Sequence, residues 1–101
     1  MTTFLIALDG ASPDLINKWI DEGYLENLGK IRNQGLSGNL ESTFPPLTGP
    51  AWSSFHTGVN PGKHGIYTWL DLSDSYKGKV INGNSIKTET IWKQISAQGG
   101  Q

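Results

Sequence analysis

The sequence predicts an α/β protein with a doubly wound sheet, and three observations support this prediction. A continuous apolar run at residues 4–8 ends at Asp9-Gly10, as a strand buried on both faces of a parallel sheet does. Apolar residues then recur at helical spacing as far as Gly23 and again as far as Gly35. Strand-like and helical segments therefore alternate along the chain, and this order is typical of a sheet joined by right-handed crossovers.

Two helices are expected between the first strand and residue 35. Ser12 followed by Pro13 is a helix-start signal, because proline fits the first helical turn, where an N–H group has no intrahelical partner. The apolar stripes of the two helices comprise Leu15, Ile16, Trp19 and Ile20 in the first, and Tyr24, Leu25, Leu28 and Ile31 in the second. We interpret both stripes as faces that pack into a core.

The remaining elements are expected to be shorter. Residues 36–43 alternate between apolar and polar as a strand does, and a helix is expected to begin at Thr48. A turn rich in glycine and proline follows at 58–65, then a strand candidate at 79–82 and a helix from about Thr88. No repeat or linker interrupts this order.

Composition bounds the class of protein. The 101 residues fit one domain, and 36% hydrophobic residues together with 13 glycines are typical of a globular chain. A net charge of -1 and scattered Lys and Arg residues disfavour a nucleic-acid-binding module. The sequence has no cysteine, which fits a reducing compartment, and no signal peptide or run of about 20 apolar residues that could span a membrane. We therefore expect a cytoplasmic protein without a membrane partner.

Thr48 is the strongest candidate for a catalytic residue. It stands where a strand-like segment gives way to a helix, and Pro50 occupies the first helical turn. The amides of Gly49 and Ala51 are expected to be free at the positive end of the helix dipole, where they would form a phosphate-binding site. A threonine at this place is also a common N-cap, and the local spacing alone favours that simpler interpretation.

Two further features change the interpretation of Thr48. Thr57-Gly58 follows nine residues after it and opens the run 57–66, and Asp9 ends the first strand about forty residues before it. Together these positions resemble the alkaline phosphatase superfamily, in its type I phosphodiesterase and nucleotide pyrophosphatase branch, and most closely its predicted phosphohydrolase and phosphomutase members. The resemblance covers nearly the whole chain, and it implies that Thr48 attacks phosphorus and that Asp9 shares a metal ion with it.

The resemblance also implies two divalent metal ions, with Zn²⁺ expected first and Mn²⁺ or Mg²⁺ as alternatives. Asp9 would be a hard oxygen ligand at the carboxyl edge of the sheet, although an Asp-Gly turn is its simpler interpretation. Coordination would lower the pKa of the Thr48 hydroxyl enough to make it a nucleophile. The implied reaction is in-line attack on a small phosphate ester, which gives a phosphothreonine that water then hydrolyses.

The implied fold is an alkaline phosphatase-like doubly wound sheet, of which residues 1–101 would be only the N-terminal part. Members of the family continue for several times this length and supply further Asp and His ligands, so the chain alone is expected to be inactive. A phosphomutase of the same superfamily remains an alternative, as does a catalytically silent domain that binds phosphate or a partner. The sequence determines neither the substrate nor the oligomeric state.

Thr43 is a second, weaker candidate for the nucleophile, because residues 43–45 match the Thr-Phe-Pro found around the nucleophile of many nucleotide pyrophosphatases. Thr43 lies fourteen residues before Thr57 instead of nine, and the two prolines that follow hold it extended. Those enzymes also carry an Asn three residues after the nucleophile, where this chain has Ala51. This difference disfavours nucleotide pyrophosphatase activity in the strict sense.

Other phosphate-binding and metal-binding interpretations fail on motif or spacing. The Cys/Ser-x-Pro-x-Arg signature of sulfatases is absent. Residues 58–63 have three residues between their glycines where the Walker A loop needs four, and His64 follows the lysine in place of Ser or Thr. His56 would lie roughly 12 Å from Thr48 at a rise of about 1.5 Å per residue, too far to share its metal. We expect His64 to have a structural role in its turn.

Overall fold

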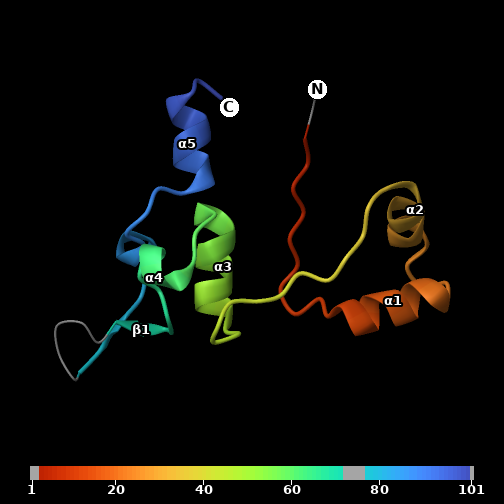
Figure 1. Cartoon of the computed structure of the whole chain (residues 1–101), viewed down its shortest axis with the longest axis horizontal. Helices are drawn as coiled ribbons and strands as arrows, with labels where there is room; N and C mark the ends of the chain where they lie inside the picture. The colour runs from red at the N-terminus through yellow and green to blue at the C-terminus, as the bar shows by residue number, and fades with distance from the viewer. Residues whose placement is uncertain (1–2, 72–76, 101) are drawn as a thin grey trace. The chain divides into compact units, whose positions relative to one another are not determined.

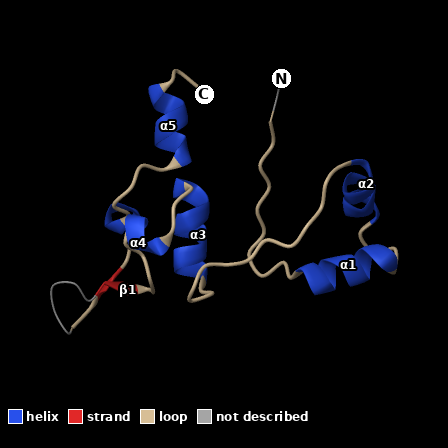
Figure 2. Cartoon of the chain, in the orientation of Figure 1, coloured by secondary structure: helices blue, strands red, loops and turns tan. Residues whose placement is uncertain are grey.

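The computed structural model describes residues 3–71 and 77–100 of the chain. These residues form two compact units, Met1–Leu40 and Glu41–Gln101. Helices make up most of the regular structure in both units (Figure 2). Among the described residues, no helix is long and apolar enough to cross a membrane.

The first unit contains two helices in the regions where the apolar stripes predicted them, α1 (Pro13–Asp21) and α2 (Glu26–Gln34) (Figure 1). The interpretation of both stripes as core-packing faces is wrong for this structure, since Trp19 is 41% exposed and Ile31 65% exposed. Ser12 is the N-cap of α1 and Pro13 its first residue, as expected from the helix-start signal. The helices meet at Gly29, where an added Cβ would lie 3.1 Å from Ile20 Cγ2. Arg32 joins them from the side, because its guanidinium contacts Asp21 Oδ1 at 2.9 Å.

The predicted buried strand at residues 4–8 is wrong for this structure. The segment runs without regular secondary structure, and the side chains of Phe4 and Ile6 are 84% and 82% exposed. Residues 36–43 also form no strand. A strand needs neighbours that satisfy its backbone N–H and C=O groups, and an apolar run does not supply them by itself. The described residues therefore leave the doubly wound sheet unconfirmed.

The second unit is built around α3 (Thr48–Thr57) and the short helix α4 (Pro61–His64). A two-stranded antiparallel sheet pairs β1 (Leu70–Asp71) with β2 (Lys79–Val80), so the strand candidate at 79–82 is confirmed only in its first half. The 3-10 helix η1 (Gly83–Ser85) and the helix α5 (Ile91–Ala97) follow. The helix expected from about Thr88 thus begins three residues later, after Thr90 as its N-cap.

The buried centre of the second unit is small and partly polar. Its most buried side chains are those of Ile66, His64 and Pro50. Pro50 belongs to α3 and His64 to α4, and these two helices pack against each other, so a well-buried part of this unit adjoins the helix that Thr48 begins.

Candidate active site

Thr48 is the first residue of α3, and Leu47 holds the N-cap position with φ -113° and ψ 148°. The interpretation of Thr48 as an N-cap is therefore wrong. The Thr48 side chain is partly exposed, and its hydroxyl has no hydrogen-bond partner among the described residues. A threonine hydroxyl that caps no helix and serves no other bond is available for chemistry.

The backbone amides at the start of α3 differ from the expectation in one position. Ala51 N–H donates to the Leu47 carbonyl at 3.0 Å, so the expectation that this amide is free is wrong. The reason is geometric. Ala51 lies four residues after the N-cap Leu47, so its N–H is the first in the helix that can donate to a carbonyl four residues earlier. Pro50 has no N–H, and the unengaged amides beside the Thr48 hydroxyl are therefore those of Thr48 and Gly49.

Gly49 is buried and packs the first turn of α3 against the segment that follows α4. A Cβ at this position would lie 3.5 Å from Ile81 Cδ1, 3.8 Å from the Thr68 carbonyl oxygen and 3.9 Å from Ile66 Cγ2. These are ordinary van der Waals distances, so a methyl group fits at this position. The residue next to Thr48 is thus held on a defined packing surface.

The Thr43 hydroxyl is engaged locally, since it donates to the Pro45 carbonyl at 3.1 Å. Leu47 N–H donates to the same oxygen at 2.9 Å, so both residues close one turn ahead of α3. Thr43 therefore lies outside the helix and has a hydrogen-bonded role. This arrangement supports Thr48 as the better nucleophile candidate.

Asp9 lies in the first unit, in an exposed turn with Gly10. Gly10 has φ 70°, a left-handed conformation that glycine adopts without steric cost, and its carbonyl accepts from Ser12 N–H at 2.9 Å. The expected Asp-Gly turn is present. Thr48 belongs to the second unit, so the structure describes each residue in its own surroundings, and their common site stays a prediction.

His64 is fully buried, and both of its ring nitrogens are engaged. Ile66 N–H donates to Nδ1 at 3.1 Å, and Nε2 lies 2.9 Å from Ser54 Oγ. An amide can only donate, so Nδ1 is the acceptor and the proton of the neutral ring is on Nε2. Burial lowers the pKa of His64 and keeps the ring neutral. The expected structural role of His64 is confirmed.

His56 lies in an aromatic cluster that joins α3 to α5. Its ring centroid is 5.6 Å from that of Trp52, 5.8 Å from that of Phe55 and 5.1 Å from that of Trp92. Edge contacts of this kind add modest stability to the burial of the rings. His56 is thus a packing residue on α3.

The residues that the structure describes do not form a metal site by themselves. No three His, Cys, Asp or Glu side chains in this part of the chain lie close enough together to hold an ion. Asp9 and Thr48 offer oxygen donors, which hard divalent cations accept, but two donors do not complete a tetrahedral or octahedral site. A metal centre that uses them needs further ligands.

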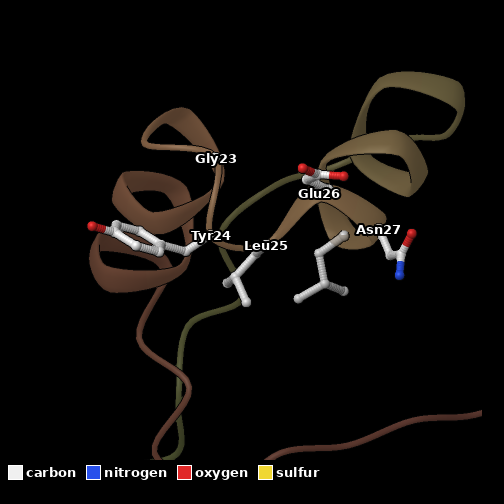
Figure 3. Close-up of a pocket in the computed structure, with 6 residues that line it drawn as sticks. Gly23, Tyr24, Leu25, Glu26 and Asn27 are labelled. Carbon is white, nitrogen blue, oxygen red and sulfur yellow. The ribbon is translucent and has the colours of Figure 1, made fainter.

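Two open hollows lie in the described residues. One of about 370 Å³ lies at the turn between α1 and α2, where Figure 3 shows Tyr24 and Leu25 extending from the turn and Glu26 at the start of α2. Another of about 370 Å³ lies in the second unit, and its lining includes Ile66, Thr68 and Ile81. Atoms of these three residues are also the nearest neighbours that a Cβ added at Gly49 would meet, and sequence patterns missed them because their proximity to α3 depends on tertiary packing.

A profile of the type I phosphodiesterase/nucleotide pyrophosphatase family matches residues 3–101. Comparison with curated proteins and with solved structures found no match. The family comprises hydrolases of the phosphodiesterase and pyrophosphatase type, which act on phosphate esters or nucleotides and typically depend on metal ions.

Proposed function

Because this chain belongs to the type I phosphodiesterase/nucleotide pyrophosphatase family, we propose that it carries the nucleophile of a metal-dependent phosphoryl-transfer hydrolase, and that Thr48 is that nucleophile. The observation that carries the proposal is the position of the Thr48 hydroxyl. It is partly exposed at the first residue of α3, lacks an intramolecular partner among the described residues, and lies beside the unengaged amide of Gly49.

The proposed reaction proceeds in two displacements. Thr48 Oγ1 loses its proton and attacks phosphorus, so that an Oγ1–P bond forms while the bond from phosphorus to the leaving alcohol breaks. A water molecule then attacks the phosphothreonine: its oxygen bonds to phosphorus, the Oγ1–P bond breaks and a proton from the water returns to Oγ1. A phosphodiester substrate is thereby released as a phosphate monoester, and a monoester substrate as phosphate. The positive end of α3 favours the phosphate group at this place throughout, since an anion gains from the helix dipole and from free amides.

Asp9 and Thr48 are the proposed metal ligands of this chain, and two Zn²⁺ ions, or Mn²⁺ or Mg²⁺, are the proposed cofactors. A bound divalent ion would lower the pKa of a coordinated hydroxyl and offset the negative charge of the displacement. The carboxylate of Asp9 is exposed in its turn, so it is accessible as a donor. The remaining ligands would come from outside the described residues.

We further propose that residues 1–101 are the N-terminal portion of an alkaline phosphatase-like catalytic domain. The exposed apolar side chains of residues 4–8 support this proposal, because an unpaired apolar run ending in Asp-Gly is the form that a buried strand takes when it has no neighbours. Ala51 stands where nucleotide pyrophosphatases carry Asn, which favours phosphate esters other than nucleotide pyrophosphates as substrates.

The test is to identify the residue that receives the phosphoryl group. The complete enzyme is mixed with a chromogenic phosphodiester, quenched in acid during turnover and digested, and the phosphorylated peptide is mapped by mass spectrometry. Phosphate on Thr48 is the expected result. Phosphate on Thr43, or on neither threonine during active turnover, would show that another residue is the nucleophile.

A further inference from the structure

The segment 61–66, which we call the α4 corner, contacts α3 at two separate heights. His64 reaches Ser54 through the 2.9 Å contact of Nε2 with Oγ. Ile66 lies near the first turn, since a Cβ added at Gly49 would be 3.9 Å from its Cγ2. The two contact points on α3 are five residues apart, which is about 7.5 Å along the helix axis. Contacts at two heights oppose both sliding and rotation of a helix.

One imidazole ring links the two contacts. His64 Nδ1 accepts the Ile66 N–H at 3.1 Å, and the same ring reaches Ser54 through Nε2. His64 is 0% exposed and Ile66 2% exposed, so water does not compete for the buried bond between them, whereas the contact with Ser54 is only partly buried. The position of the Ile66 side chain against Gly49 therefore depends on the ring of His64.

Residues 87 and 88 donate hydrogen bonds to carbonyl groups of the α4 corner. Lys87 N–H donates to the His64 carbonyl at 3.0 Å, and the Thr88 hydroxyl donates to the Lys63 carbonyl at 3.3 Å. The aliphatic stem of Lys87 lies over Gly65, where an added Cβ would be 3.0 Å from Lys87 Cδ. Because these contacts fix the α4 corner, the corner can in turn restrain the helix α3 that it contacts.

We propose that His64 and Ile66 are positioning residues for Thr48, because they set the axial position and rotation of the first turn of α3. This inference rests on the proposed function of Thr48. In-line displacement requires the attacking oxygen to be aligned with the bond that breaks, and a displacement of about 1 Å can lower the rate about 100-fold. Both side chains are buried, so the proposed role acts through the Gly49 turn.

The test uses matched variants of the complete enzyme. Ile66→Ala removes the γ-methyl group that meets Gly49, whereas Ile66→Val keeps a branched side chain there and loses only the terminal methyl. His64→Leu removes both ring hydrogen bonds, whereas His64→Asn keeps an oxygen that can accept the Ile66 N–H. Thr57→Val is the control for general destabilisation, since it breaks the buried 2.7 Å bond to the Ser53 carbonyl at the far end of α3.

Ile66→Ala and His64→Leu are expected to lower kcat roughly 10- to 100-fold with KM changed less than about twofold, on the scale of misalignment. Ile66→Val and His64→Asn should recover most of kcat, and Thr57→Val should keep kcat while lowering the melting temperature. If Ile66→Ala is folded and keeps full kcat, or if only KM changes, the positioning role is wrong. Activity retained by Thr48→Ala would instead contradict the proposed nucleophile, so the two failures are distinguishable.

Discussion

The ring of His64 lies 2.9 Å from the hydroxyl of Ser54, yet this pair does not form a serine–histidine catalytic dyad. A dyad needs an unprotonated nitrogen that accepts the serine proton. Here the Ile66 N–H occupies Nδ1, so in the neutral ring Nε2 carries the proton and faces Ser54 as a donor. This partly buried pair therefore joins α4 to α3, and the partly exposed Thr48 stays the proposed nucleophile.

The engagement of both ring nitrogens predicts that acid destabilises the second unit. Burial lowers the pKa of His64 in the folded protein below its ordinary value of 6.5. Below pH 6.5 the unfolded chain therefore binds more protons than the folded chain, and the free energy of unfolding decreases as pH falls toward the folded pKa. Above pH 6.5 the stability that depends on the neutral ring of His64 is fully present. Denaturant titrations of the protein at several pH values between 5 and 8, the range about the ordinary histidine pKa, measure the effect.

His64→Asn and His56→Asn separate the two histidines in that experiment. The His64 variant should be less stable at neutral pH and should lose most of the decrease below pH 6.5. The His56 variant alters the aromatic contact with Trp92 but leaves the buried ring in place, so it should keep the decrease. If the pH dependence of stability persists in His64→Asn and disappears in His56→Asn, the effect belongs to His56 and the prediction for His64 is wrong.

Substitution of Thr48 is expected to abolish turnover of the complete enzyme. Thr48→Ala removes the nucleophilic oxygen and should lower kcat by about three orders of magnitude or more, as loss of a nucleophile does in other hydrolases. Thr43→Ala, which removes a hydrogen bond to the Pro45 carbonyl, should keep most of the activity. Steady-state kinetics with a chromogenic phosphodiester measure both. The opposite ranking of the two variants would favour Thr43.

Asp9→Asn tests the proposed metal ligand in the complete enzyme. The substitution replaces a charged oxygen donor by a neutral one that binds hard cations poorly, so both metal content and turnover should decrease. Asp9 is exposed in a turn, and the change should have little effect on folding. Metal content is measured by mass spectrometry of the elements, with Asp14→Asn as a control in the first turn of α1. Unchanged content and rate would leave Asp9 as a turn residue only.

Local signals predicted the helices well. The Ser-Pro start of α1 and the start of α3 at Thr48 depend on preferences within a few residues, and the structure has both where they were expected. The prediction that the Ala51 amide is free was wrong. Leu47, not Thr48, is the N-cap of α3, and the Ala51 N–H donates to the Leu47 carbonyl. A shift of one position at a helix start changes which amides are free.

Strand pairing and tertiary packing could not be predicted from the sequence. Residues 4–8 have the composition of a buried strand, but pairing and burial require neighbouring segments, and the described structure leaves Phe4 and Ile6 exposed. The proximity of Ile66 to Gly49 brings together positions seventeen residues apart and has no sequence signature. The position of Thr48 at the start of α3 is thus predictable from the sequence, whereas the packing that holds this helix is not.

The final prediction concerns residues 1–101 alone, which should not hydrolyse phosphate esters. Among the described residues no three acidic, histidine or cysteine side chains converge, and Asp9 and Thr48 together supply too few donors for a metal site. Without coordination the Thr48 hydroxyl stays protonated near neutral pH and is a weak nucleophile. Purified chain, a chromogenic phosphodiester and added Zn²⁺, Mn²⁺ or Mg²⁺ provide the assay, with Thr48→Ala as the control. Multiple turnover that disappears in that variant would show that these residues, alone or as an oligomer, assemble a complete site.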